Sequence, residues 1–391
     1  MIERTLAPRL LDLAGHYPVV TLTGPRQAGK TTLCRAVFPD KPYVSLELLE
    51  AREYATRDPR GFLAEHSRGA VVDDVQHAPE LLSYLQVEVD ERPEHGRFVL
   101  TGSQHFGLTE RISQSLAGRT AVLHLLPLEL AELRRFGALP RGLFEVLWAG
   151  SYPRIHDRGI PPHQWLADYV TTYVQRDVRQ VLNVTDLETF STFLKLCAGR
   201  TSQEINLSAL GDDAGVTHTT ARSWLSVLEA SFLCFRVPGW HRNLRKQTIK
   251  AHKLHFFDSG LVCYLLGIRD PEHLRHHPLR GAVFESWVAS EVYKARAHRG
   301  LRPELFHYRD AKGLEVDLVL ETSRTVLVEV KSGATVNEDF FKSLRQLAQA
   351  ALERGAGESL ELRLVYGGES PQRRSDLTVV PWSEVDAQDW S

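Results

Sequence analysis

The chain has 391 residues, 43% hydrophobic and 25% charged, a composition typical of soluble globular proteins at a length that predicts two or three domains. A formal net charge of −2 excludes a global attraction to nucleic acid, so any such contact must come from a local basic stretch. The cysteines form no C-x-x-C pair and no apolar run is long enough to span a bilayer, which argues against a zinc module, a disulfide framework and membrane contact and favours a cytoplasmic protein.

A phosphate-binding loop follows the first expected strand, at residues 20–23. The loop has the pattern G-x-x-x-x-G-K-[ST], with a helix expected from about Lys30. Gly24 and Gly29 let backbone N–H groups turn toward phosphates, Lys30 reaches the β and γ oxygens, and the Thr31 hydroxyl binds Mg²⁺. We expect Lys30 to be exposed and to contribute little to packing. The residues predicted to hold a nucleoside triphosphate are Gly24, Pro25, Arg26, Gln27, Ala28, Gly29, Lys30, Thr31 and Thr32.

Two further strands end in polar residues. The apolar segment 69–72 leads into Asp73 and Asp74, a Walker B pattern in which Asp73 holds Mg²⁺. Asp74 stands where a carboxylate positions the attacking water, although Asp is one methylene shorter than the usual Glu. The alternative is a buried strand that ends in a solvated Asp pair. The segment 97–104 ends in small polar residues, of which Ser103 is the candidate contact to the γ-phosphate or the water.

The chain resembles the AAA+ ATPases, and more narrowly the archaeal Holliday-junction-resolvase-like ATPase group, whose C-terminal domain has no known function. The resemblance covers nearly the whole chain and is carried by GPRQAGKTTL, VVDDVQHAPELL, FVLTGS, SLAGRTAVLHLLPL and GSYPRI. Asp74 departs from the Asp-Glu usual in this group. The resemblance implies ATP and Mg²⁺ as cofactors and a homo-oligomeric ring, most simply a hexamer.

Further site residues follow from the same resemblance. An arginine from a neighbouring subunit would reach the γ-phosphate, and Arg119 is the first candidate, with Arg111 the second. Each is equally explained as a surface arginine. Pro153 would pack near the adenine, and Arg154 would sense the same nucleotide.

The middle of the chain predicts helices and a winged helix-turn-helix. Apolar positions in 163–197 have helical spacing, and a short helix at 207–214 is followed by a turn and a second helix at 219–230. Strands expected at 232–240 and 253–257 would form the wing. The outward-facing residues of the second helix would be those that a recognition helix presents to DNA, namely Thr219, Thr220, Arg222 and Ser223.

A basic stretch lies between the two wing strands. Residues 241–257 contain no acid, which makes this stretch the most plausible phosphate-contacting surface in a chain of balanced charge. The candidate DNA contacts are Arg242, Arg245, Lys246, Lys250 and Lys253. Winged helices also serve in protein assembly, and that alternative stays open.

A β-hairpin is expected in the last third of the chain. Residues 314–321 alternate, turn at 322–324 and return at 325–331. If Glu321 pairs with Thr325, Asp317 lies opposite Glu329 and Glu315 opposite Lys331. Opposed carboxylates repel each other, so a cation between them is the natural reason for this arrangement.

This hairpin resembles the D…E-x-K motif of PD-(D/E)xK nucleases, in particular the Holliday-junction resolvases. The resemblance implies that Asp317 and Glu329 hold Mg²⁺ and that Glu285 on a preceding helix completes the metal site. Lys331 would position the attacking water or offset charge at the phosphate. The alternative is a degenerate copy that is kept as a fold or a docking surface.

The expected architecture is an α/β multidomain protein. An AAA+ core with a small lid would occupy residues 1–160, a helical linker and winged helix 161–270, and a restriction-endonuclease-like α/β domain 271–391. The leading expectation is an ATPase that acts on duplex or branched DNA. Two alternatives stay open: an ATP-controlled oligomeric switch or scaffold, and a metal-dependent nuclease gated by its ATPase.

Overall fold

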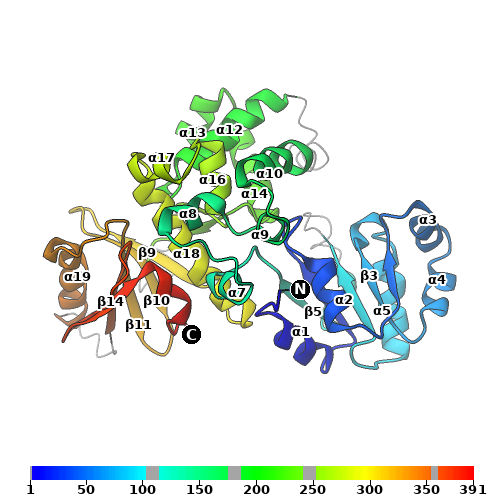
Figure 1. The fold of residues 1–391 in the computed structure, drawn as a ribbon. Coiled ribbons are helices and arrows are strands. Elements are labelled where there is room, and N and C mark those ends of the chain that lie inside the picture. The colour runs from blue at the N-terminus through cyan, green and yellow to red at the C-terminus, as the bar shows by residue number, and fades with distance from the viewer. Residues whose placement is uncertain (1, 103–113, 175–185, 241–251, 354–359) are drawn as a thin grey trace. The chain divides into compact units, whose positions relative to one another are not determined.

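Two compact units make up the chain (Figure 1). The computed structural model describes residues 2–102, 114–174, 186–240, 252–353 and 360–391. The first unit is Met1–Pro127 together with the short segments Ala230–Phe232 and His298–Gly300, and the second unit contains the remaining residues. The sequence-based division into three domains at residues 160 and 270 stays a prediction.

A parallel five-stranded sheet forms the centre of the first unit, in the order β2-β3-β4-β1-β5. Its strands are β1 (Val19–Thr23), β2 (Tyr43–Ser45), β3 (Ala70–Asp73), β4 (Phe98–Thr101) and β5 (Thr120–His124). Because these strands are parallel, β1, β3 and β4 place their carboxyl ends at the same edge, where open α/β sheets bind their ligands. The three motifs predicted to contact the triphosphate follow these strands.

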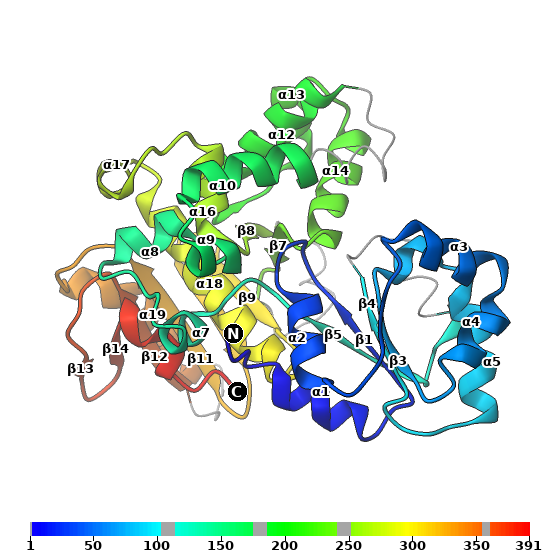
Figure 2. The ribbon, with the colours of Figure 1, turned by 45° about the vertical axis from the view of Figure 1, so that its right-hand side comes forward.

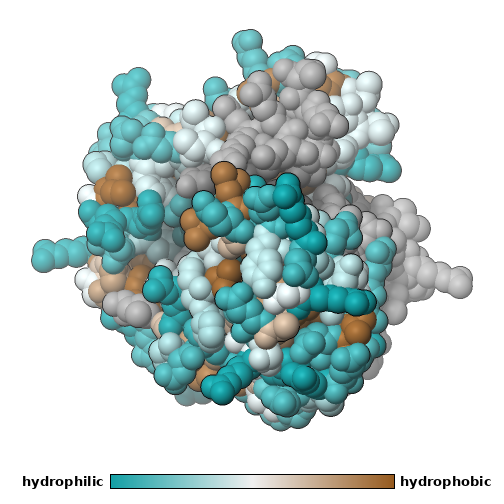
Figure 3. All heavy atoms as spheres, turned by 90° about the vertical axis from the view of Figure 1, so that its right-hand side faces the viewer, coloured by the Kyte–Doolittle hydropathy of each residue, from teal (hydrophilic) through white to brown (hydrophobic). Residues whose placement is uncertain are grey.

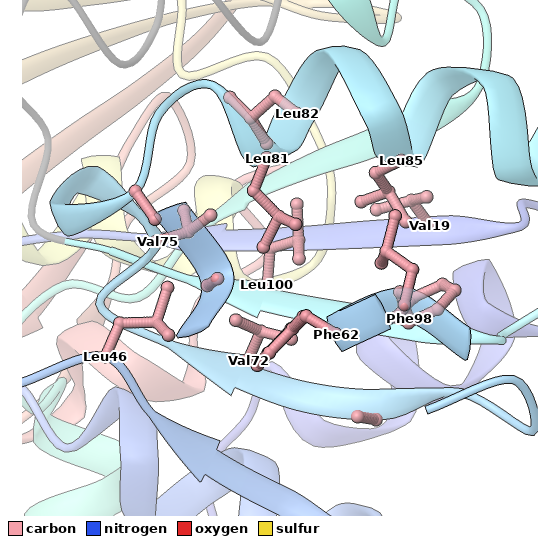
Figure 4. Close-up of a cluster of buried hydrophobic side chains, with 14 of the residues drawn as sticks. Val19, Leu46, Phe62, Val72, Val75, Leu81, Leu82, Leu85, Phe98 and Leu100 are labelled. Carbon is pink, nitrogen blue, oxygen red and sulfur yellow. The ribbon is translucent and has the colours of Figure 1, made fainter. Parts of the chain in front are cut away.

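Helices cover both faces of this sheet, as Figure 2 shows. They are α1 (Ala7–Ala14), α2 (Lys30–Val37), α3 (Leu49–Arg57), α4 (Pro59–Glu65) and α5 (Leu81–Glu91). On β3, Val72 packs with the cluster under α3, α4 and α5, which is drawn in Figure 4, while Val71 packs with α1 and α2. Burial on both faces explains why these strands are continuously apolar.

The face of the molecule drawn in Figure 3 is mostly hydrophilic, with single hydrophobic residues scattered over it. Scattered apolar residues of this kind are ordinary on a surface that faces water. Within the described ranges, no helix combines the length and the apolarity needed to cross a membrane.

A helical region begins the second unit. Its helices include α7 (Leu130–Arg135), α8 (Leu143–Ala149), α9 (Pro153–Arg158), α10 (Pro162–Tyr169), the π-helix η2 (Val170–Val174), α12 (Leu187–Gly199), α13 (Leu207–Ala214), α14 (His218–Ala230), α16 (Ser259–Leu265), α17 (Pro271–His276) and α18 (Arg280–His298). The two helices predicted at 207–214 and 219–230 are confirmed as α13 and α14. The Asn206 side chain caps α13 by accepting from the backbone N–H groups of Ser208 and Ala209.

Two sheets complete the second unit. A small sheet contains β6 (Gln203–Glu204), β8 (Lys253–Phe256) and β7 (Cys234–Val237), in that order, and confirms the two strands predicted to flank the basic stretch. The larger mixed sheet has the order β13-β14-β12-β11-β10-β9. Its elements and the helices beside it are β9 (Leu305–Arg309), β10 (Glu315–Glu321), β11 (Thr325–Lys331), η3 (Glu338–Phe341), α19 (Lys342–Glu353), β12 (Leu360–Tyr366), β13 (Gln372–Arg373), β14 (Thr378–Pro381) and η4 (Trp382–Ala387).

Candidate functional site

The loop between β1 and α2 has the backbone of a phosphate-binding loop. Gly24, Gln27 and Gly29 have φ angles of 144°, 64° and 95°, in the region that favours glycine. A Cβ on Gly24 would lie 2.1 Å from the carbonyl oxygen of Leu125, so this position excludes a side chain on steric grounds as well. Helix α2 begins at Lys30, as the sequence predicts, and directs its amino-terminal N–H groups toward the loop.

Lys30 is buried, and the expectation of an exposed lysine is wrong. Its Nζ donates hydrogen bonds of 2.9 Å to the carbonyl oxygens of Gly24 and Pro25, so the side chain folds back over the loop that it follows. Burial lowers the pKa of Lys30 to about 8, although the charges of Asp74 and Asp73 partly oppose the shift. The ammonium is therefore held by two carbonyl oxygens of the loop.

Asp73 ends β3 and gathers hydroxyl groups from three elements. Its Oδ2 accepts from Thr31 Oγ1 at 2.8 Å and from the Tyr43 hydroxyl at 2.7 Å, and its Oδ1 accepts from the Thr101 hydroxyl. Burial, followed by the hydrogen bond to Asp73, raises the pKa of Tyr43. The Thr31–Asp73 contact brings together the two side chains predicted to hold Mg²⁺. Sequence reasoning missed Tyr43. Thr101 belongs to the segment 97–104 expected to contact the γ-phosphate, in which Ser103 is the predicted contact.

Asp74 has a left-handed backbone, with φ 57° and ψ 47°. Asp and Asn tolerate this conformation better than most residues because their short polar side chains form local hydrogen bonds. Here Oδ1 of Asp74 accepts from Gln76 Nε2 at 2.8 Å, and the Asp74 backbone N–H donates to Thr101 Oγ1 at 3.3 Å. The carboxylate is therefore held by a neighbouring amide, and its role toward water stays a prediction.

Arg119 immediately precedes β5 and is bound within its own unit. Its guanidinium donates to both carboxylate oxygens of Asp90, at 2.6 and 2.8 Å, and to the Ala117 carbonyl oxygen at 3.0 Å. About a third of the side chain is exposed. A role in a neighbouring subunit would require Arg119 to leave Asp90, and this role stays a prediction.

Other predicted nucleotide contacts have no described geometry with the loop. Ser103 and Arg111 lie outside the described residues. Pro153 begins α9, which belongs to the second unit, and its position beside the adenine stays a prediction, as does the role of Arg154.

The predicted hairpin register is confirmed for the four residue pairs next to the turn. Strands β10 and β11 pair Glu321 with Thr325 and continue to Leu318 with Val328, which makes Asp317 and Glu329 the next residues along the two strands. Both carboxylates are buried, and Asp317 Oδ2 accepts from the Val330 backbone N–H at 2.8 Å. The hairpin therefore brings together the two acids predicted to bind metal.

A lysine that the sequence analysis assigned to DNA contact lies among the carboxylates of this site. Lys253, the first residue of β8, directs its Nζ to within 2.9 Å of Glu285, 2.7 Å of Glu315 and 3.7 Å of Asp317. Lys331 forms an ion pair with Glu329. We call these six residues the carboxylate cluster: Lys253, Glu285, Glu315, Asp317, Glu329 and Lys331.

Lys253 is therefore not the exposed DNA contact that the sequence predicts. Its side chain is 3% exposed, and a buried ammonium surrounded by carboxylates cannot present its charge to a phosphate backbone. The other candidate DNA contacts, Arg242, Arg245, Lys246 and Lys250, lie outside the described residues.

The cluster shifts the pKa values of its own members. Burial and then the charge of Asp317 raise the pKa of Glu285 and of Glu329, each to about 8. Burial alone would lower the pKa of Lys253, but the charges of Glu285, Asp317 and Glu315 outweigh it and raise this pKa. Lys253 thus stays protonated, while burial and the charge of Asp317 favour the protonated forms of Glu285 and Glu329.

Helix α14, the second helix of the predicted helix-turn-helix, has the two faces expected from the sequence. Ala221, Trp224 and Leu225 are buried, whereas Arg222 and Ser223 are exposed, as is Thr219 in the first turn. Thr220 is half-buried and hydrogen-bonds with Thr217. The use of the exposed face in DNA contact stays a prediction.

The parallel sheet, the loop and the Thr31–Asp73 contact define a P-loop ATPase domain of the AAA class. Residues 16–134 match a family described as an AAA domain, which in general binds ATP and Mg²⁺. Residues 280–385 match a domain of unknown function called DUF4143, and residues 140–272 match a domain of unknown function called DUF8612.

Relatives of nearly the same extent define the family. An uncharacterised protein of Mycobacterium tuberculosis, Rv2008c, is 31% identical over 98% of this chain and 85% of its own length, and an uncharacterised Mycobacterium bovis protein, Mb2031c, matches equally well. The chain belongs to the family of these mycobacterial proteins.

Comparison with solved structures gives lower sequence identities. The Walker-type ATPase PABY2304 of Pyrococcus abyssi is 15% identical, with a TM-score of 0.46 over 66% of this chain and 94% of its own. A RuvB variant of Thermotoga maritima is 20% identical, with a TM-score of 0.32 over 59% of this chain and 87% of its own.

Proposed function

We propose that this chain hydrolyses ATP at the loop between β1 and α2 and that it acts on DNA. The observation that carries the proposal of hydrolysis is the 2.8 Å hydrogen bond between Thr31 and Asp73, which joins the phosphate loop to the acid at the end of β3. Mg²⁺ would be held by Thr31 and Asp73 and would offset the charge of the triphosphate. Lys30 would exchange its two carbonyl partners for phosphate oxygens when ATP binds.

Asp74 is the proposed water-positioning residue. It follows the Mg²⁺-binding acid directly, and its backbone N–H bonds to Thr101, which also bonds Asp73. This shared hydroxyl fixes the two acids relative to each other, as a reaction at one phosphorus atom requires. Arg119 from a neighbouring subunit would supply the remaining positive charge, which requires an oligomer, and we propose a hexameric ring.

The proposal of DNA action rests on a helix-turn-helix and a basic stretch. The exposed residues Thr219, Arg222 and Ser223 lie in the first turns of α14, where a recognition helix meets base edges. Residues 241–252 add cationic side chains without an acid. Such a stretch contributes salt-dependent affinity for phosphates.

ATP turnover with different DNA forms tests this function. We expect hydrolysis by the full chain and stimulation by at least one of linear duplex, single-stranded and four-way-junction DNA. The triple variant Arg242→Glu, Arg245→Glu, Lys246→Glu should lose this stimulation and weaken DNA binding about uniformly across sequences, with a smaller salt dependence.

A matched control changes the same amount of charge elsewhere. Arg60, Arg68 and Arg92 are exposed arginines of the first unit, and their reversal to Glu should leave DNA stimulation unchanged. Hydrolysis that no DNA form stimulates, together with ATP-dependent oligomerisation, would instead favour the switch or scaffold. No ATP turnover under any condition would contradict the proposal as a whole.

A further inference from the structure

Lys253 supplies a cation to the carboxylate cluster from outside the motif that defines it. The motif residues come from α18, β10 and β11, whereas Lys253 comes from β8 in the small sheet. Its Nζ lies within 4 Å of three carboxylates, at 2.9 Å from Glu285, 2.7 Å from Glu315 and 3.7 Å from Asp317. A single ammonium thus bridges acids that are far apart along the chain.

This position is the one that a divalent ion would need. An ion bound through Glu285 Oε1 and Asp317 Oδ1 would share these oxygens with the Lys253 ammonium. The Lys253 ammonium and a divalent ion bound to the same carboxylates would repel each other. The repulsion is strong because the side chain of Lys253 is only 3% exposed and little water screens the charges. With Lys253 in place, these residues therefore do not fit the metal that their motif implies.

We propose that the Lys253 ammonium takes the place of a divalent metal ion in the carboxylate cluster, so that the cluster is held together without metal. Lys253 ties the small sheet that flanks the basic stretch to the hairpin of the nuclease-like sheet. The same side chain keeps Mg²⁺ and Mn²⁺ from the motif acids. This inference does not depend on ATP hydrolysis or on DNA binding.

The cluster contains more carboxylates than lysines. Glu329 Oε2 is buried and has no hydrogen-bond partner among the described atoms, and four carboxylates face two lysines. Removing the amine of Lys253 leaves the cluster with a single lysine and a space between Glu285, Glu315 and Asp317. That environment has the oxygen ligands and the charge that a hard divalent cation prefers.

Mn²⁺ binding to the full chain tests the proposal without relying on enzyme activity. Each protein carries Asp73→Asn and is kept free of nucleotide, so that the phosphate loop does not contribute a Mn²⁺ site. Free Mn²⁺ is measured by its electron paramagnetic resonance signal during a titration. We expect the protein that retains Lys253 to bind Mn²⁺ weakly. The Lys253→Met variant should gain one Mn²⁺ site per chain, with an affinity about tenfold or more above that of the protein that retains Lys253.

Matched variants locate the new site. Lys253→Arg keeps the positive charge and should gain no Mn²⁺ site, while adding Asp317→Asn to Lys253→Met should remove the gained site. In thermal melts, Mn²⁺ should raise the melting temperature of Lys253→Met and leave that of the protein with Lys253 unchanged, because an ion stabilises the folded state only when it binds there.

Two results would overturn the proposal. One is a folded Lys253→Met variant that binds Mn²⁺ no better than the protein with Lys253. The other does not depend on the folding of a Lys253 variant. It is binding of micromolar Mn²⁺ by the protein that retains Lys253, together with loss of this binding in Asp317→Asn. The second result would mean that the metal and Lys253 occupy the cluster together.

Discussion

The Thr31 hydroxyl donates to Oδ2 of Asp73 at 2.8 Å, across 42 positions of sequence. Thr31 lies in the first turn of α2 and Asp73 ends β3, so the contact depends on the parallel order of the central sheet. The same Asp73 oxygen accepts from Tyr43, and the other accepts from Thr101. In a site that binds Mg²⁺ through Thr31 and Asp73, these hydroxyls fix the carboxylate before the ion arrives.

Lys30→Met tests the phosphate-loop assignment. Methionine keeps most of the length of the side chain and removes the ammonium, so we expect turnover to fall by about 10²-fold or more through loss of phosphate stabilisation. Because Lys30 is buried and bonds Gly24 and Pro25, some loss of thermal stability is also expected. ATP turnover and a thermal melt should be measured on the same preparation. A stable variant with unchanged turnover would contradict the assignment.

The pKa of Lys30 predicts a pH dependence of ATP binding. Burial lowers this pKa to about 8 in the nucleotide-free protein, whereas bound phosphates would raise it again, so binding above pH 8 must be accompanied by proton uptake. The affinity for ATP should therefore fall as the pH rises above 8, approaching about tenfold per pH unit.

Calorimetric titrations at several pH values and in buffers of different ionisation enthalpy would measure this uptake. Lys30→Arg serves as the control, because a guanidinium remains charged throughout this range and should show no such trend. An affinity of the original protein that stays constant between pH 7 and pH 9 would contradict the prediction.

Asp74 is tested by removing its charge while keeping its backbone preference. Asn also tolerates the left-handed conformation seen at this position, so Asp74→Asn should fold normally, bind ATP and turn it over about 10²–10⁴-fold more slowly. Asp74→Glu restores the usual reach toward water and should hold or raise the rate. If Asp74→Glu is inactive while Asp74→Ala is active, Asp74 does not position the water.

Arg119 is tested by complementation between subunits. Arg119→Ala should bind ATP but lose about 10³-fold or more in turnover if it acts on a neighbour's phosphate. Mixing it with Lys30→Met should restore part of the activity, because some interfaces then pair an intact loop with an intact arginine.

Asp90→Ala is the matched control for that experiment, since it releases Arg119 from the ion pair without removing it and should keep turnover. If Arg119→Ala and Asp90→Ala lose equal amounts of thermal stability and neither loses activity, Arg119 is a surface residue that pairs with Asp90.

The sequence alone determined the features that depend on short segments. Residues close together in the chain encode the phosphate loop, the start of α2, helices α13 and α14, and the register of β10 with β11. Glycines at positive φ, helical periodicity and a tight turn specify these features locally. The hairpin register also showed in advance that Asp317 and Glu329 approach each other.

The tertiary structure decided which side chains meet across different elements. From the sequence, Lys253 is one of several cations predicted to contact DNA. The pairing of β8 within its sheet instead places it against Glu285 and Glu315. Lys30 reads as an exposed loop residue, yet it is buried against the loop that precedes it. Such partners are selected by the packing of distant segments, which the local pattern of a sequence does not contain. Burial and charge then set the chemistry of each group, so a lysine that sequence assigned to DNA becomes the internal cation of a carboxylate cluster.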